Sequence, residues 1–272
     1  MMIIDIHVHA FGEETAKAVL DGMDAAGIDK CCLFAPAPET DELPKRWAMR
    51  EATDWLARIA AEAPDRILPF CWIEPTLPGA VQELEYAIAD KGFAGVKMIA
   101  NHWYPCDETV FPVYEKAGEL NAPIIFHSGI LYFHGDSSRF NRPVFWEPLL
   151  HFPKVRFALA HISWPWVDEC LALYGRFRAL NSEGREHPHQ MWIDTTPGTP
   201  PAWREDALRK TLSFAGDEYI LWGSDSVGTG IHEHGVDVLR SDRQLLHQQL
   251  GAPAETERRW LGENALRFLG LV

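Results

Sequence analysis

The chain has 272 residues, of which 47% are hydrophobic and 24% are charged, so it can bury a large core within one domain. Its formal net charge of −14 argues against nucleic acid and anionic membrane surfaces as partners, because like charges repel. No apolar stretch reaches membrane-spanning length and the apolar N-terminus lacks a basic flank, so a single cytoplasmic domain over residues 1–272 is expected.

Short apolar segments rich in β-branched and aromatic residues alternate along the chain with longer segments of helical periodicity. The predicted strands are residues 2–6, 30–34, 67–73, 95–99, 124–126, 156–160, 191–194 and 219–222. The predicted helices are residues 14–26, 45–63, 78–91, 108–120, 143–151, 164–180, 204–214 and 260–272, and the longest irregular segments are 128–142, 181–190, 197–202 and 226–236. Strands that alternate with helices in this way are typical of parallel βαβ units, which close into a single-domain α/β barrel of the (β/α)8 type.

The first predicted strand ends in the sequence His7-Val8-His9. Because side chains alternate between the two faces of a strand, the two histidines point to one side and Val8 to the other. Two imidazoles side by side at a strand end are well placed to bind one divalent metal ion. Buried histidines that only make hydrogen bonds are as common, so this motif alone leaves both interpretations open.

Polar residues also lie at or just after the carboxyl ends of other predicted strands: Lys97, His127, His161, Asp194 and Asp225. In a parallel barrel all of these ends meet at one mouth, where loops build the active site. Burying so many ionisable groups together costs free energy unless they pair with each other or coordinate a metal ion. The pattern therefore predicts a metal centre at the mouth of the barrel.

The segments around these residues, in this order, resemble the amidohydrolase superfamily, and specifically the amidohydrolase-related branch that includes aminocarboxymuconate-semialdehyde decarboxylase. The matching segments are Asp-Ile-His-Val-His at 5–9, Gly-Val-Lys-Met at 95–98, Phe-His-Ser-Gly at 126–129, Ala-His-Ile-Ser at 160–163, Gly-Ser-Asp at 223–225 and Leu-Gly-Glu-Asn-Ala-Leu-Arg at 261–267. No one segment is specific, but the ordered set runs nearly from end to end of the chain. The resemblance implies a distorted TIM barrel with a metal ion at the C-terminal ends of its strands.

The resemblance also implies roles for individual residues. His7, His9, His127 and Asp225 correspond to the family's metal ligands, and His161 corresponds to a histidine that acts as acid, base or electrophile. Three imidazoles and one carboxylate suit one divalent ion, zinc best, with manganese, iron or cobalt as alternatives. The other interpretation of His127 and Asp225 is a hydrogen-bonded core pair. For His161 the alternatives are a second metal ligand and a residue that contacts the ligands without binding the metal ion.

Lys97 and the loops beyond the strands are the candidates for binding a small-molecule substrate. For Lys97 a contact with the substrate or with a metal ligand is preferred. The alternatives are a structural ion pair and, as in binuclear relatives, a carboxylated bridge between two metal ions. The loop candidates are Asn101, His102, Trp103, Tyr132, Trp164 and Arg139, whose aromatic rings would suit a flat substrate, although packing explains each ring at least as well. The His-Glu-His sequence at 232–234 is expected in a flexible rim loop rather than in a metal site.

The leading functional hypothesis is a metal-dependent hydrolase of a small cyclic amide, lactone or related carbonyl compound. Water activated by the metal would attack, Asp225 would take its proton and His161 would polarise the carbonyl group. The alternative is a metal-dependent, non-oxidative decarboxylase of an aromatic or unsaturated carboxylic acid, in which Asp225 or His161 protonates the ring carbon. The third hypothesis is a non-catalytic barrel, or a lactonase-like relative that works without metal. Aromatic surface loops also make a homodimer an option.

Overall fold

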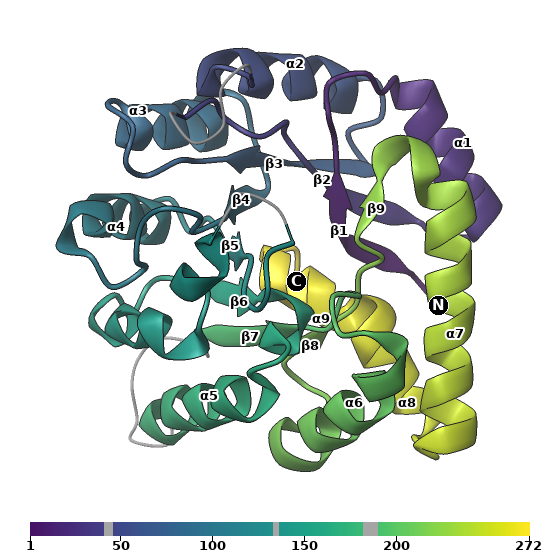
Figure 1. The fold of residues 1–272 in the computed structure, drawn as a ribbon. Helices are drawn as coiled ribbons and strands as arrows, with labels where there is room; N and C mark the ends of the chain where they lie inside the picture. The colour runs from purple at the N-terminus through teal and green to yellow at the C-terminus, as the bar shows by residue number, and fades with distance from the viewer. Residues whose placement is uncertain (41–45, 133–135, 182–189) are drawn as a thin grey trace.

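The computed structural model describes residues 1–40, 46–132, 136–181 and 190–272, whose strands form one parallel sheet (Figure 1). Neighbouring strands follow the order β8-β7-β6-β5-β4-β3-β2-β1-β9. The strands are β1 (Ile4–His9), β2 (Lys30–Phe34), β3 (Ile67–Trp72), β4 (Gly95–Met98), β5 (Ile124–Phe126), β6 (Phe157–Leu159), β7 (Met191–Asp194), β8 (Ile220–Leu221) and β9 (Ser226–Val227). Every predicted strand is confirmed to within three residues at each end, and β9 is an addition.

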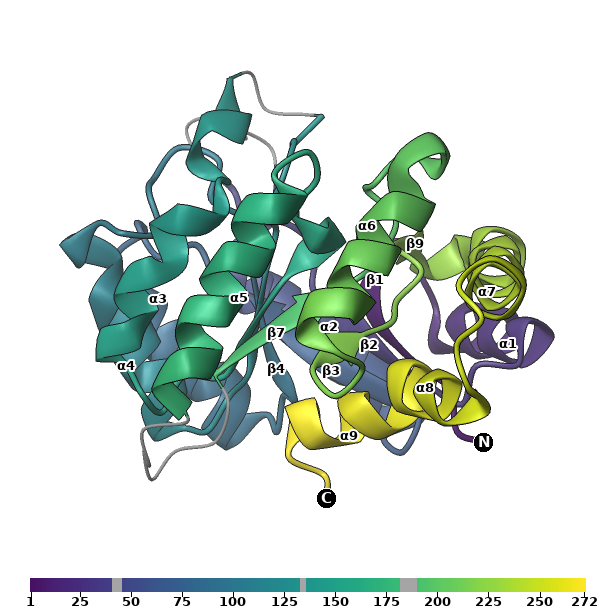
Figure 2. The ribbon, with the colours of Figure 1, turned by 90° about the horizontal axis from the view of Figure 1, so that it is seen from below.

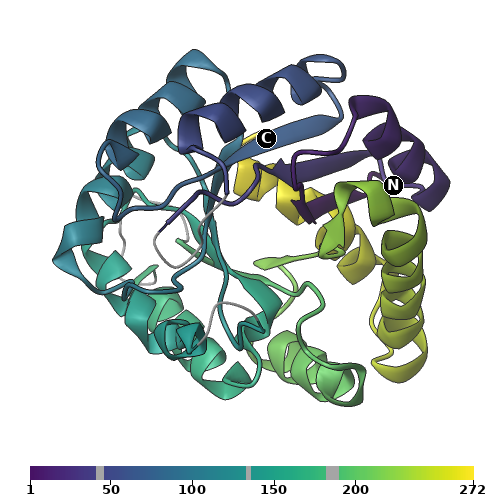
Figure 3. The ribbon, with the colours of Figure 1, turned by 45° about the horizontal axis from the view of Figure 1, so that its top comes forward.

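The sheet closes on itself because the chain bends between β8 and β9 and reaches the first strand. β9 pairs with the end of β1, where Val8 lies opposite Ser226, and the Ile6 N–H donates to the Trp222 carbonyl oxygen at 3.2 Å. Helices surround the strands on the outside, as the tilted view shows (Figure 3). The predicted distorted (β/α)8 barrel is therefore confirmed, and its distortion is the division of the eighth strand into β8 and β9.

The helices that cover the barrel follow the strands in the predicted alternation. The α-helices are α1 (Ala16–Ala26), α2 (Met49–Ala61), α3 (Ala80–Glu85), α4 (Phe111–Glu119), α5 (Val167–Asn181), α6 (Pro201–Ala215), α7 (Val236–Gln244), α8 (Ala254–Arg258) and α9 (Asn264–Leu269). Shorter or irregular helical segments are η1 (Tyr86–Asp90), η2 (Glu108–Val110), η3 (Ser137–Phe140), η4 (Pro143–His151), η5 (Ala160–Ser163), η6 (Gly228–Gly230), η7 (Ile231–Gly235), η8 (Leu245–Gln249) and η9 (Arg259–Glu263). No described helix has the combination of length and apolar character needed to cross a membrane.

The last helix, α9, closes one end of the barrel. Inside the barrel, strand side chains and α9 share one hydrophobic cluster, with Ile4, Ile6, Phe34, Phe70, Ile125, Trp192, Leu221 and Phe268 among its members. Asn264 Nδ2 donates to the Ile220 carbonyl oxygen at 2.8 Å, and Arg156 Nε donates to the Phe268 carbonyl oxygen at 2.5 Å. Because Ile220 and Arg156 lie where β8 and β6 begin, α9 covers the amino-terminal ends of the strands (Figure 2). Only the opposite end of the barrel, where the strands have their carboxyl ends, is therefore open for a functional site.

The segment after β8 differs most from the prediction. Residues 226–236, predicted to be irregular, contain β9, η6 and η7, and α7 with its continuation η8 follows where no helix is predicted. In α7 a charged residue, Asp242, takes a buried position and interrupts the apolar pattern. Asp242 is buried because it pairs with Arg204 at 2.6 Å and accepts from Trp222 Nε1 at 3.0 Å. The sequence pattern does not predict α7 because the partner that stabilises the buried Asp242 carboxylate lies on a distant segment of the chain.

Smaller differences follow from proline. The predicted helix at 143–151 is a 3-10 segment, η4, which contains Pro148, and the predicted helix at 164–180 begins only at Val167, after Pro165. Proline lacks the N–H that an α-helix interior needs and restricts the residue before it. Parts of three other predictions, namely residue 45 of the helix at 45–63, residues 133–135 of the segment 128–142 and residues 182–189 of the segment 181–190, lie outside the described residues.

Candidate metal centre

A β-bulge in β1 sets the direction of the two histidines of its His-x-His motif. The pairing register between β1 and β2 shifts there, so that Ile6 and His7 together oppose the single residue Cys32. Ile6 packs in the interior cluster and Val8 in the outer core, while the rings of His7 and His9 meet each other. The predicted shared face of the histidines is confirmed, but a regular strand would have turned Ile6 outward with Val8. Bulges of this kind re-aim side chains next to active sites.

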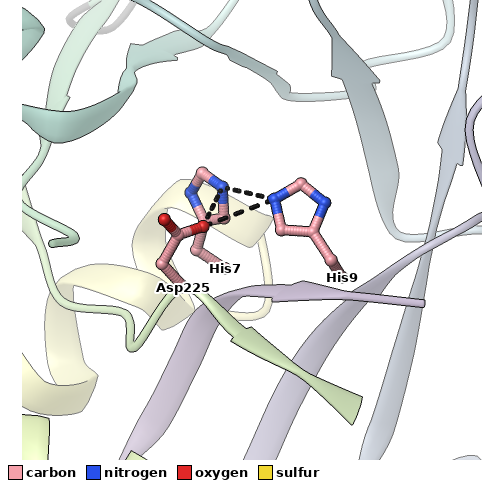
Figure 4. A group of neighbouring side chains, drawn as sticks. All are labelled: His7, His9 and Asp225. Carbon is pink, nitrogen blue, oxygen red and sulfur yellow. Dashed lines mark hydrogen bonds and ion pairs between the residues drawn. The ribbon is translucent and has the colours of Figure 1, made fainter. Parts of the chain in front are cut away.

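Three of the four predicted metal ligands come together at the mouth of the barrel (Figure 4). His7 Nε2 lies 3.2 Å from His9 Nε2, and Asp225 Oδ1 lies 3.4 Å from each of these nitrogens. Atoms that share one tetrahedral metal ion lie roughly 3–3.5 Å apart, given metal–ligand bonds of about 2.1 Å. In the part of the chain that the structure describes, this is the one cluster of three or more His, Cys, Asp or Glu with ligand atoms within 4.8 Å of one another.

The other nitrogen of His7 is tied to a buried carboxylate. His7 Nδ1 lies 2.7 Å from Asp194 Oδ2, and both side chains are fully buried. A proton held on Nδ1 by this carboxylate leaves the Nε2 lone pair directed at the cluster, as in metal-binding histidines. Burial, and then the charges of Lys97 and of the neighbouring histidines, hold the pKa of His7 well below its usual value. The imidazole is therefore neutral, which is the state that binds metal.

The environment of His127 also fits a metal ion. Its ring centroid lies 4.9 Å from that of His161, which in turn lies 5.2 Å from that of His7. Among the described residues, His127 Nε2 is buried without a hydrogen-bond partner, while the ring also bonds to the Ile130 backbone. A buried nitrogen left without a partner is costly unless something coordinates it. His127 lies outside the group of three, so its role as the fourth ligand stays a prediction, and its unpartnered nitrogen is consistent with that role.

His161 is held at the mouth by strained backbone and by the loop after β7. It begins three consecutive residues whose φ angles are left-handed, at +63°, +49° and +54°. The Thr196 hydroxyl lies 3.1 Å from His161 Nδ1, and the Thr199 hydroxyl donates to the His161 carbonyl oxygen at 3.0 Å. Burial lowers the pKa of His161 to about 4, although the charge of Asp225 opposes this shift, so the imidazole is neutral. Backbone strain of this kind is concentrated at functional sites.

Lys97 is fully buried beside the same group. Its Nζ lies 3.2 Å from His7 Nε2 and 4.9 Å from the centre of the Phe34 ring. Burial lowers the pKa of Lys97 to about 8, while the carboxylates of Asp194 and Asp225 act in the opposite direction. The hydrogen bond joins Lys97 to a predicted metal ligand, while contact with the substrate, a structural ion pair and carboxylation all stay predictions.

Three of the predicted substrate-binding residues lie together in the loop after β4. Trp103 is 4% exposed and donates to Glu74 Oε2 at 3.3 Å, so its ring is packed within the protein. Asn101 Oδ1 hydrogen-bonds to Nδ1 of the His102 ring, and His102 Nε2 lies 3.7 Å from Glu74 Oε1. The buried carboxylate of Glu74 at the centre of this cluster is not indicated by the sequence pattern.

The other predicted substrate-binding residues are spread around the rim. Tyr132 is 66% exposed, and Arg139 Nη1 pairs with Asp136 Oδ2 at 3.2 Å. The ring of Trp164 packs on that of Trp203, with a distance of 5.8 Å between the centroids. All three follow strands at the mouth end, and their part in substrate binding stays a prediction.

Trp72, which the sequence pattern does not single out, lies next to one of the histidines of the metal group. It ends β3 opposite Lys97, and its ring centroid lies 6.1 Å from that of His9. Because Lys97 faces inward and paired residues of neighbouring strands share a face, Trp72 also faces the interior. The residue is only partly buried.

The His-Glu-His sequence at 232–234 does not form the flexible rim loop that is predicted. It lies in the helical turn η7, which packs against α1 and leads into α7. His232 Nε2 lies 3.4 Å from Glu233 Oε1, with both side chains largely exposed. Neither histidine belongs to a cluster with metal-ligand spacing among the residues that the structure describes.

The similarity to known proteins covers the whole chain. The family model described as Amidohydrolase matches residues 4–271. No curated protein sequence matches the chain. The family match thus spans every strand and all of the residues that form the site.

Solved structures are similar to this chain along its whole length. A 2,6-dihydroxybenzoate decarboxylase from Rhizobium has a TM-score of 0.70 at 16% identity, covering 100% of this chain and 99% of that chain. An uncharacterized TIM-barrel protein from Bordetella bronchiseptica has a TM-score of 0.74 at 16% identity, covering 99% of each chain. A 5-carboxyvanillate decarboxylase from Novosphingobium aromaticivorans, with bound manganese and 3-methoxy-4-hydroxy-5-nitrobenzoic acid, has a TM-score of 0.69 at 15% identity, covering 99% of this chain and 97% of that chain. At such low identity the similarity shows a shared TIM-barrel fold.

Proposed function

Because the chain belongs to the amidohydrolase family, we propose that it is a metal-dependent enzyme that decarboxylates an aromatic carboxylic acid without oxidising it. Hydrolysis of a cyclic amide or lactone, which leads on the sequence alone, becomes the second candidate. The order changes because structural neighbours with named activities act on 2,6-dihydroxybenzoate and 5-carboxyvanillate, both aromatic acids.

The observation that carries this proposal is the group of His7, His9 and Asp225, with the unpartnered nitrogen of His127 beside it. These four residues would hold one divalent ion. Zinc and manganese both accept imidazole and carboxylate ligands, and manganese is the ion in the 5-carboxyvanillate decarboxylase structure. When bound, the ion supplies a positive charge that orients the oxygen atoms of the substrate and draws electron density from them.

Asp225 is the proposed proton carrier. Decarboxylation requires a proton at the ring carbon that bears the carboxylate. The bond from that carbon to the carboxylate then breaks, its electrons restore the aromatic ring, and carbon dioxide leaves. The Asp225 side chain is 30% exposed, so it can take a proton from water at the mouth and deliver it to the ring. Burial raises the pKa of Asp225, but the hydrogen bond with His9 and the charge of Lys97 outweigh this effect and lower the pKa, so Asp225 rests in the ionised form that accepts this proton.

His161 and Trp72 are proposed to position the substrate. The neutral ring of His161 is held by Thr196 and Thr199 and can offer a hydrogen bond of fixed direction. Trp72 offers an aromatic face next to His9, against which a planar ring can stack while water is kept away. Together they would present the carboxylate-bearing carbon to Asp225.

The products of the reaction test this proposal. Chain purified without a metal-binding tag is loaded with manganese or zinc and incubated with 2,6-dihydroxybenzoate, 5-carboxyvanillate and a panel of lactones and cyclic amides. The proposal predicts carbon dioxide and the decarboxylated ring from an aromatic acid, and loss of this activity in Asp225→Asn. Ring-opened acids from the lactones or amides, with no carbon dioxide from any aromatic acid, would make the protein a hydrolase instead.

A further inference from the structure

Asp5 is a buried carboxylate that the proposed reaction does not use. It is fully buried, and its hydrogen-bond donors among the described residues are neutral groups. Oδ1 accepts from the backbone N–H of Ser224 at 2.9 Å and of His7 at 3.1 Å, and Oδ2 accepts from the Ser224 hydroxyl at 2.5 Å. A carboxylate in such surroundings is expensive to bury, so its presence calls for a physical reason.

The partners of Asp5 lie on the two segments that carry the metal group. His7 belongs to β1, whereas Ser224 belongs to the bend between β8 and β9 that also carries Asp225. Asp225 has a left-handed φ of +58° and lies between two serines whose hydroxyls are 2.6 Å apart. The second of these, Ser226, also donates its backbone N–H to the Ser224 hydroxyl at 3.1 Å. Both chain neighbours of the strained residue are therefore tied into the network that Asp5 anchors.

This bend is otherwise joined to β1 by few backbone contacts. The Ile6 N–H donates to the Trp222 carbonyl oxygen, and β9 pairs with β1 over two residues only. The approach is also close, because a Cβ added to Gly223 would lie 2.8 Å from His7 Cβ. The distance between the ligands on β1 and the ligand on the bend therefore depends on side-chain hydrogen bonds across this join.

We infer that Asp5 is a positioning residue that holds Asp225 at its place opposite His7 and His9 before any metal ion binds. Its carboxylate fixes the backbone on both sides of the join, so that the ligand set is formed in advance and binding does not have to order it. The inference rests on the metal site of the proposed function and is independent of which reaction that site catalyses.

Two substitutions of Asp5 separate positioning from charge. In Asp5→Asn the amide oxygen can accept from both backbone N–H groups, and the amide nitrogen can donate to the Ser224 hydroxyl, which turns its own hydrogen to Ser226. In Asp5→Ala all of these donors lose their acceptor. We expect Asp5→Ala to weaken metal binding about 10- to 100-fold, as loss of groups that orient ligands does, and Asp5→Asn to stay within about threefold of the wild type.

The measurement is equilibrium dialysis of the metal-free full chain against Mn²⁺ and, separately, Zn²⁺, with urea unfolding of each metal-free variant. Ser224→Ala removes one hydroxyl of the network and should weaken metal binding several-fold, which is less than the effect of Asp5→Ala. If Asp5→Ala does not fold, the metal affinity of Ser224→Ala tests the inference in its place. Thr211→Ala is the matched control, because it removes a buried hydroxyl whose hydrogen bond, to the Ala207 carbonyl oxygen at 2.7 Å, stays within α6. Its affinity should equal that of the wild type.

Two results would overturn the inference while leaving the metal site in place. The first is wild-type metal affinity in folded Asp5→Ala or, if that variant is unfolded, in Ser224→Ala. The second is an Asp5→Asn protein that binds metal as weakly as Asp5→Ala does. The second result would mean that negative charge, and not hydrogen bonding, matters at this position. A wild-type chain that binds neither ion would overturn both the inference and the metal site.

Discussion

Replacing Gly198 by alanine should disable His161 without touching a metal ligand. A Cβ at position 198 would lie 2.5 Å from Cγ and 2.6 Å from Nδ1 of the His161 ring. Carbon atoms in contact stay about 3.5 Å apart, so the ring must move by about 1 Å. Gly198 does not have a left-handed φ, so the methyl group itself is the perturbation. A shift of about 1 Å in a reacting group costs roughly 100-fold in rate, or about 2.7 kcal/mol of transition-state stabilisation.

The assay for Gly198→Ala is the rate of carbon dioxide release from an aromatic acid, with metal content measured on the same sample. We expect kcat/KM to fall about 100-fold while the metal content is unchanged, with overpacking lowering the free energy of unfolding by about 1–3 kcal/mol. Gly230→Ala is the control, because its Cβ would meet no atom within 4 Å and its φ is −106°. Full activity in Gly198→Ala would refute the role given to His161, and loss of metal would make His161 a ligand.

Three further substitutions test the surroundings of the metal group. Asp194→Asn should weaken metal binding about 10- to 100-fold in equilibrium dialysis, because His7 loses the carboxylate that fixes its proton on Nδ1, and unchanged affinity would contradict this role. Trp72→Ala should raise KM for aromatic acids about tenfold, the equivalent of a lost aromatic contact of about 1.4 kcal/mol, at constant metal content. If KM does not change, the substrate ring lies elsewhere. The Lys97→Met protein should bind as much metal as the wild type. Loss of metal from this variant in elemental analysis would support a carboxylated lysine that bridges two ions.

The barrel and the location of its site could be predicted because they depend on local patterns. Apolar strands alternate with helical segments along the chain, and the ends of parallel strands must meet at one mouth. Asp225 is far in sequence from His7 and His9, yet the strand order brings the three side chains together as expected. The family resemblance added the roles of ligands, which the residues alone left open.

The rest depends on contacts between distant segments, which no local pattern contains. The bulge that turns both Ile6 and His7 inward comes from the pairing of β1 with β2, and the partnership of His7 with Asp194 joins the first strand to the seventh. The helix α7 is not predicted from the sequence because its buried Asp242 is stabilised by an ion pair with Arg204 on α6. In each case the residue is held by a strand pairing or a polar side chain from a distant segment of the chain.

The measurement that tests the central claim most directly is metal content per chain, by elemental mass spectrometry, on protein purified without a metal-binding tag. We expect about one divalent ion per wild-type chain and almost none in His7→Ala or Asp225→Asn, with both variants still folded. Wild-type protein that is free of metal, and still releases carbon dioxide from an aromatic acid after treatment with a chelator, would contradict the central claim.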